Sequence, residues 1–296
     1  MPTATTSRPP VAIEITADAV IAARGSHGAV QAYASRSLPP AAVSPNLTAP
    51  NVAGPTALAT AVQDALAAID ARTRDLTAVL PDAAVRTMLL DFDTLPDRPA
   101  EALPLIRFRL KKLLPFDAER AALSYHAFRV PGAVRVAAAV ALASTVEEYE
   151  SAIRDAGYSP GVVLPSLAAA LGAVDPSRPT LLVKSDAATT TVAIVDQGEL
   201  RLVRTMENTR GHNGVSDQLA DDIYPLLVFF QDTYGAPIER ILVSGAADAN
   251  RLRAEIEPYA TAKVHELISS SSLAASYTGD STPRGLLAGV IGALQA

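Results

Sequence analysis

The chain has 296 residues, of which 49% are hydrophobic and 19% charged, and its formal net charge is −6. This composition is typical of a protein with a substantial apolar core and excludes a largely disordered chain. The sequence has no cysteine, which excludes disulfides, thiolate-bound metals and a cysteine nucleophile, and fits a reducing cytoplasm. Charges of both signs are interspersed, so we expect no nucleic-acid partner. The longest apolar runs, 136–143 and 286–294, are shorter than the ~20 residues of a membrane-spanning helix, so we expect no direct membrane insertion.

Hydrophobic periodicity and turn residues predict an α/β pattern in the first half of the chain. A polar segment at 1–10 is rich in Thr and Pro, and we expect it to be disordered. A β-hairpin follows, with strands at 11–15 and 19–23 around the turn Thr16-Ala17-Asp18. After a proline-rich loop, the predicted elements are a helix at 56–72, strands at 76–80 and 87–92, a helix at 99–114, paired strands at 122–129 and 134–143, a helix at 145–156, a strand at 161–165 and a helical turn at 166–171.

A second α/β unit follows the segment DPSRP at 175–179, which is typical of a linker. Its predicted elements are strands at 180–184, 189–195 and 199–205, a helix at 216–234, a strand at 241–243, and helices at 250–256 and 283–294. Both units open on a β-hairpin, and the segment 76–143 forms an inserted α+β module between them. Periodicity alone does not separate this plan from a generic α/β fold.

Four further segments follow one another in an order and spacing that resembles a known family. They are AVLPDAAVRTMLLDF (78–92), IRFRLKKLLPFDAE (106–119), VEEYESAIRDAGYSPGVVLPSLAAALGAV (146–174) and ILVSGA (241–246). Together with the two hairpins, they resemble the type IV pilus assembly protein PilM family of the actin-like ATPase superfamily over most of residues 11–296. The resemblance implies a duplicated, two-lobed actin-like (ribonuclease H-like) α/β fold. It places the first lobe at 11–175, with an inserted α+β subdomain at about 76–143, and the second lobe at 176–296.

Members of this superfamily hold nucleotide phosphates between two hairpin turns, where glycine lets the backbone approach and a carboxylate positions Mg²⁺. The resemblance places the corresponding positions at Glu14, Thr16, Ala17 and Asp18, at Lys184, Ser185, Asp186 and Thr190, and on the adenosine side at Gly245 and Ala246. Thr16 adds a Cβ where the backbone would approach phosphate, and Asp18 would repel phosphate. Lys184 replaces a carboxylate, and Asp186 falls where glycine is usual. We therefore expect a degenerate site that binds no cofactor, or Mg-ATP only weakly.

No pattern in the sequence assigns catalytic residues or metal ligands. The four histidines are widely separated and lack the i, i+4 spacing of a metal-binding helix: His27, His126, His212 and His265. The sequence also has no G-x-S-x-G nucleophile elbow. A basic cluster at 107–112 lies in a predicted helix. It is either a solvated helix face or a surface that faces a membrane or a partner.

The resemblance to PilM implies a cytoplasmic scaffold that is peripheral to the inner membrane through its partners. It would serve a type IV pilus or type II secretion-like assembly system by binding the N-terminal cytoplasmic tail of a PilN-like inner-membrane protein. In that family the tail lies in a groove between the first lobe and the inserted subdomain, which the segments 76–92 and 122–143 would border here. The alternative is an ATP-dependent kinase or ATPase of the same superfamily. A third possibility is a relative that forms homo-oligomers.

Overall fold

The computed structural model describes residues 8–26, 29–208, 218–269, 273, 278–279 and 281–295. A six-stranded sheet has the order β14-β3-β2-β1-β4-β8. Its strands are β1 (Val11–Ile15), β2 (Ala19–Ser26), β3 (Ala29–Ser37), β4 (Asp75–Leu80), β8 (Ser159–Pro165) and β14 (Thr278–Gly279). The strands β1, β2 and β3 pair antiparallel, and β4 pairs parallel with β1 and with β8. Most of the predicted tail lies outside the described residues.

A five-stranded sheet repeats this plan in the second half of the chain, with the order β11-β10-β9-β12-β13. Its strands are β9 (Thr180–Ser185), β10 (Thr189–Asp196), β11 (Glu199–Glu207), β12 (Arg240–Gly245) and β13 (Lys263–Glu266). Here too, three antiparallel strands come first, and two strands parallel to the first of them complete the sheet. Because β3-β2-β1-β4-β8 and β11-β10-β9-β12-β13 match strand for strand, the two sheets form a structural duplication.

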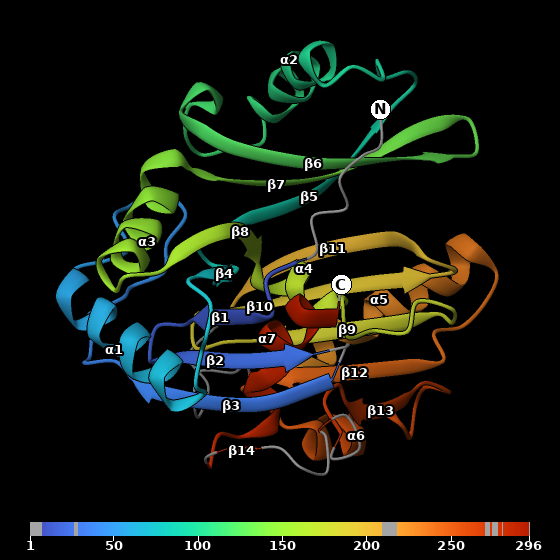
Figure 1. The fold of residues 1–296 in the computed structure, drawn as a ribbon. Coiled ribbons are helices and arrows are strands. Elements are labelled where there is room, and N and C mark those ends of the chain that lie inside the picture. The colour runs from blue at the N-terminus through green and yellow to red at the C-terminus, as the bar shows by residue number, and fades with distance from the viewer. Residues whose placement is uncertain are drawn as a thin grey trace.

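Helices cover both sheets and also fill the space between them (Figure 1). The outer face of the first sheet packs on α1 (Pro55–Ala68) and α3 (Ala143–Asp155), and that of the second on α5 (Leu219–Tyr234) and α6 (Ala249–Ile256). Two short helices, α4 (Ser166–Leu171) and α7 (Ala288–Gln295), lie in one apolar cluster with residues of both sheets. These two helices therefore form the layer that joins the lobes.

Strand alternation decides which side chains face this middle layer. Ile13 and Ile15 belong to the cluster on the α1 side, whereas Ala12 belongs to the middle cluster. On β9, Leu181 and Val183 face the α5 side and Leu182 faces the middle. Residues 14 and 184, each two positions beyond a middle-facing residue, therefore point toward each other between the lobes.

The third unit is a three-stranded sheet with the order β5-β7-β6, inserted between β4 and α3. It comprises β5 (Arg86–Phe92), α2 (Pro99–Leu110), the 3₁₀ helix η1 (Ala118–Arg120), β6 (Ala121–Val130) and β7 (Ala133–Leu142). Ile106 and Leu110 of α2 are buried against this sheet. Although the predicted insertion began at residue 76, β4 lies in the six-stranded sheet. The boundaries of the domains themselves stay a prediction.

Three strands were not predicted: β3, β13 and β14. The predicted helix at 283–294 begins as the 3₁₀ helix η4 (Arg284–Leu287) before α7. The helix predicted at 216–234 is observed as α5, and its first predicted residues lie outside the described part of the chain. Across the described residues, no helix is long and apolar enough to cross a membrane.

Candidate functional site

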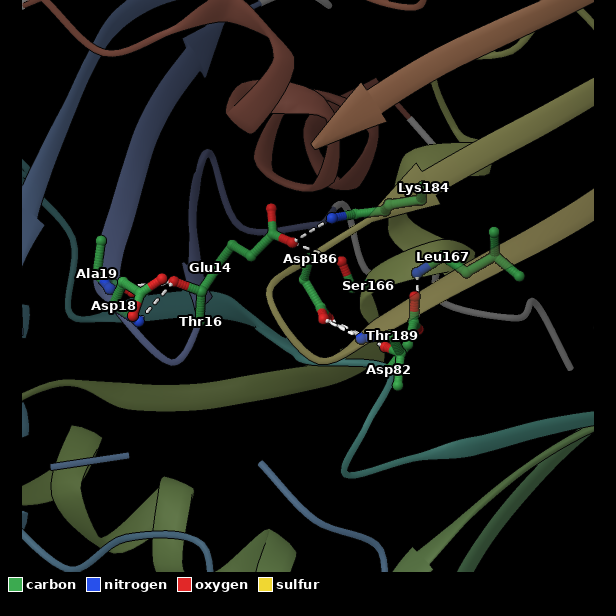
Figure 2. A network of polar contacts seen from close by, with 10 residues as sticks. All are labelled: Glu14, Thr16, Asp18, Ala19, Asp82, Ser166, Leu167, Lys184, Asp186 and Thr189. Carbon is green, nitrogen blue, oxygen red and sulfur yellow. Dashed lines mark hydrogen bonds and ion pairs between the residues drawn. The ribbon is translucent and has the colours of Figure 1, made fainter. Parts of the chain in front are cut away.

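The predicted nucleotide residues lie where the two hairpins approach the middle layer (Figure 2). In the first hairpin, the hydroxyl oxygen of Thr16 accepts hydrogen bonds from the backbone N–H groups of Ala19 at 3.0 Å and Asp18 at 3.3 Å. The hydroxyl also donates to the carbonyl of Ala19 at 3.1 Å. Thr16 and Ala17 are half-buried, and Asp18 is exposed. The side chain of Thr16 therefore uses amide groups of the turn that a phosphate would need.

The second hairpin turn is closed by the carboxylate of Asp186. Its Oδ1 accepts the N–H groups of Ala188 at 2.8 Å and Thr189 at 2.7 Å, and its Oδ2 accepts the hydroxyl of Thr189 at 3.2 Å. A phosphate bound here would have to displace this carboxylate and would meet its negative charge. In both turns a side chain of the chain itself therefore takes the hydrogen bonds of the amides.

Asn208 secures the same turn from the end of β11, although the sequence analysis did not select this residue. The hydroxyl groups of Ser185 and Thr190 lie 2.8 Å apart, and that of Thr190 donates to Oδ1 of Asn208 at 2.7 Å. The amide of Asn208 donates to the carbonyl of Asp186 at 2.7 Å. Ser185 and Thr190 are buried in this network.

Glu14 and Lys184 form an ion pair between the lobes, with Nζ of Lys184 2.9 Å from Oε1 of Glu14. Only 2% of the Glu14 side chain and 8% of the Lys184 side chain are exposed. Ser166 at the start of α4 donates its hydroxyl to the same carboxylate oxygen at 2.5 Å. Figure 2 shows the Glu14 carboxylate directed at the ammonium group of Lys184. The positive charge of Lys184 in the second hairpin thus neutralises the negative charge of Glu14 in the first.

Helix α7 leaves room for this pair only because it carries glycine. A Cβ at position 289 would lie 2.2 Å from Oε2 of Glu14, and one at position 292 would lie 2.0 Å from the carbonyl of Ala169 in α4. Gly289 and Gly292 therefore let α7 approach β1 and α4 closely. Neither glycine was selected from the sequence, although their i, i+3 spacing on one helix face was a usable signal.

The adenosine-side residues pack against the second hairpin. Gly245 has a φ of +81°, and a Cβ there would lie 1.8 Å from the carbonyl oxygen of Ser185. The N–H of Ala246 donates to that oxygen at 2.9 Å. Gly245 is thus required by its contact with β9 and by its backbone conformation.

Asp82, in the turn after β4, is a buried acid that the sequence analysis did not select. Its carboxylate accepts the N–H of Leu167 at 3.0 Å, at the start of α4. Burial raises its pKa to about 7, and the negative charges of Asp186 and Glu14 add to the rise, while Lys184 and the Leu167 N–H oppose it. Burial alone would lower the pKa of Lys184, but the surrounding carboxylates outweigh burial and raise it. Lys184 therefore stays charged among three acids.

Two hollows border this region. The first, which we call the interlobe cleft, has a volume of about 650 Å³ and is lined by Pro45, Asn46, Leu47, Thr48, Asp82, Ala83, Arg86, Pro115, Ala188, Thr189, Thr205, Glu207 and Asn208. The second, the apolar groove, has a volume of about 200 Å³ and is lined by Leu80, Val85, Ala122, Leu123, Ser124, Ala139, Ala141, Val146, Val163, Leu164 and Pro165. Within the described residues, no cluster of three or more His, Asp or Glu side chains is arranged to hold a metal ion. His27 and His212 lie outside those residues.

A duplicated α/β fold with an inserted three-stranded sheet and two hairpins facing one interlobe site is the two-lobed actin-like fold. The solved structures agree. The chain superposes on a chain of a structure described as "PilM-PilN type IV pilus biogenesis complex" with a TM-score of 0.76 and 19% identity, over 97% of this chain and 98% of that one. Similarity extends to the cytoplasmic domain of EpsL, an inner-membrane component of the type II secretion system of Vibrio cholerae (TM-score 0.54, 11% identity, 97% and 94% covered). It extends also to the ethanolamine utilization protein EutJ from Carboxydothermus hydrogenoformans (TM-score 0.50, 10% identity, 97% of this chain and 89% of that one covered).

These likenesses confirm the predicted fold class and the structural resemblance to PilM. No protein-family model matches the sequence, and no curated protein matches it either. The residues of the two hairpins do not fit Mg-nucleotide, because turn amides already bond to Thr16 and Asp186 and the carboxylate of Glu14 is already paired with a lysine.

Proposed function

We propose that this chain is a non-catalytic cytoplasmic scaffold of a type IV pilus or type II secretion-like assembly system. Its partner would be the N-terminal cytoplasmic tail of a PilN-like inner-membrane protein, which would hold the scaffold at the membrane. The fold similarity to PilM from a PilM–PilN complex and to the cytoplasmic domain of EpsL supports this proposal. The observation that carries it is the apolar groove.

The apolar groove lies between two sheets that each end in an edge strand. The six-stranded sheet ends at β8 and the inserted sheet ends at β6, and residues of both strands line the groove. An edge strand offers unpaired backbone groups to an extended peptide, while a groove beside it accepts alternate apolar side chains. Its lining is apolar except for Ser124, which suits an apolar tail segment.

The ion pair between Glu14 and Lys184 supports the non-catalytic part of the proposal. The two side chains occupy the space between the hairpins, and their ion pair joins the two lobes without a ligand. A nucleotide would have to separate two buried, oppositely charged groups, which is costly in a site of low dielectric.

Filling the groove tests the scaffold proposal. Ala122, which is half-buried on β6 in the groove, is replaced by Trp, and Ala127, which is exposed on the same strand, is replaced by Trp as the control. Fluorescence anisotropy then measures the affinity for a labelled peptide that carries the cytoplasmic tail of the membrane protein encoded beside this chain. We expect Ala122→Trp to weaken binding at least tenfold and Ala127→Trp to leave it unchanged. Absence of binding by the wild type at micromolar concentrations would overturn the proposal.

One observation favours the alternative of an ATP-dependent kinase or ATPase. The interlobe cleft is lined by polar groups from both lobes, including Asp82, whose pKa of about 7 would suit a general acid or base. This alternative predicts that Mg-ATP raises the melting temperature through mass action. The scaffold proposal predicts no shift at millimolar Mg-ATP, and a rise of several degrees would favour the enzyme.

A further inference from the structure

Helix α2 carries exposed apolar side chains on the face directed away from the protein. Phe108 is 72% exposed and Leu105 is 45% exposed. The opposite face of the helix supplies Ile106 and Leu110 to the core of the inserted unit. The helix is therefore apolar on both sides, and only one side has a covering partner within the described chain. We call Leu105, Phe108, Lys111 and Lys112 the α2 surface.

This surface is basic in a chain whose net charge is −6. The segment 102–116 contains four basic residues and no acidic residue. Arg107 turns inward and donates to the carbonyls of Ala118 and Ala121, but Lys111 and Lys112 are exposed and form no ion pair within the described residues. Glu101, on the preceding turn, is engaged by Arg98 at 3.5 Å.

The position of α2 makes the surface accessible to a flat partner. Figure 1 shows α2 as the outermost layer of the inserted unit, at the top of the view, with the three-stranded sheet beneath it. A planar surface could therefore contact α2 without meeting either large sheet.

We propose that the α2 surface docks on an anionic phospholipid membrane. Phenylalanine and leucine on one helix face enter the boundary between head groups and acyl chains, and the flanking lysines extend to the phosphates. Lysine is depleted at the centre of protein–protein interfaces, so two adjacent free lysines beside an exposed phenylalanine favour lipid over a protein partner. One such surface gives weak, reversible binding that depends on salt. The inference goes beyond the proposed function, because it needs no tail peptide.

Co-sedimentation with vesicles tests the proposal directly. The whole chain is mixed with large unilamellar vesicles of phosphatidylglycerol and phosphatidylcholine in equal parts, or of phosphatidylcholine alone. We expect binding to the anionic vesicles only, with a marked decrease as salt is raised. Phe108→Ser removes the burial of one aromatic ring and should weaken binding about tenfold or more. Lys111→Glu/Lys112→Glu removes two attractions and adds two repulsions, so it should weaken binding about thirtyfold or more.

Matched controls separate the surface from general effects of charge and apolarity. Tyr259 is 77% exposed after α6, so Tyr259→Ser removes an equally exposed aromatic ring elsewhere. Arg72→Glu/Lys263→Glu makes the same change of net charge at other exposed sites. Both controls should bind like the wild type, and circular dichroism confirms that all variants are folded.

Equal binding to both kinds of vesicle, no binding to either, or unchanged binding of the α2 variants would overturn the proposal. Self-association that the lysine variants abolish, without vesicle binding, would assign the surface to a second copy instead. The tail-peptide assay is run on the same variants, and retained peptide affinity together with lost vesicle binding keeps this inference separate from the scaffold proposal.

Discussion

Replacing Lys184 by Met would leave Glu14 as an unpaired carboxylate in the layer between the lobes. The two groups are 2.9 Å apart and almost completely buried, and the pair joins β1 to β9. Breaking a buried ion pair by removing one partner costs about 3–5 kcal/mol, because the remaining charge keeps its desolvation penalty. We expect Lys184→Met to lower the free energy of unfolding by about that amount. The double variant Glu14→Gln/Lys184→Met should recover most of the loss, since it leaves no buried charge from the pair.

Urea unfolding followed by circular dichroism measures these changes, because the chain has no tryptophan to report by fluorescence. Arg72 and Asp70 provide the control, since their ion pair has the same 2.9 Å separation but both side chains are largely exposed. Arg72→Met should cost less than about 1 kcal/mol. If Lys184→Met costs no more than this control, or if the double variant is less stable than Lys184→Met alone, the assignment of a buried, lobe-joining pair is wrong.

Two further predictions concern the same region. Because burial raises the pKa of Asp82 from 3.8 to about 7, the folded state holds a proton that the unfolded chain has lost between these pH values, and stability falls as pH rises through this window. At 1.36 kcal/mol per pH unit, the wild type loses at most roughly 4 kcal/mol of unfolding free energy across this window. The variant Asp82→Asn lacks this titration, so its stability relative to the wild type should rise from pH 4 to pH 7. Parallel curves of stability against pH would contradict this. Gly245→Ala should cost roughly 3 kcal/mol or more, because φ is positive and a backbone oxygen lies 1.8 Å from the new Cβ. Gly132→Ala, with φ of +75° and free space, should cost about 1 kcal/mol in the same urea-unfolding assay, and equal losses would refute the steric argument.

The duplicated plan could be predicted because it rests on local signals. Each hairpin is marked by a β-rich run on either side of a short polar turn, and hydrophobic periodicity marks most of the helices. The strand β3 (Ala29–Ser37) was not predicted, and its alanine-rich sequence has weak strand propensity. Its place in the sheet comes from pairing with β2, which is a tertiary effect. The two-residue β14 pairs with β3 across about 245 residues of sequence and has no local signal.

The sequence allowed the residues of the candidate site to be selected, but not the contacts that they make with residues distant in the chain. The sequence showed that Lys184 stands where a carboxylate is usual, and this was read as a loss. It could not show that Glu14, 170 positions away, lies within 2.9 Å and forms a buried ion pair with the lysine. Asp82 was likewise invisible as a buried acid, because the groups around it come from distant parts of the chain, such as Leu167, more than 80 residues later.

The unusual residues of the two hairpins are better explained as one set of contacts than as separate substitutions. Thr16 alone would weaken phosphate binding, and Lys184 alone would place an unpaired charge in a buried layer. Lys184 with Glu14 gives a neutral pair, and Gly289 supplies the space that this pair needs beside α7. Each change that removes a ligand contact thus also adds a contact within the chain, so the lobes are held together by the protein's own groups. Under the scaffold proposal, such a chain would need no nucleotide to hold its lobes in one arrangement, and a fixed arrangement would suit the proposed docking groove between the first lobe and its insertion.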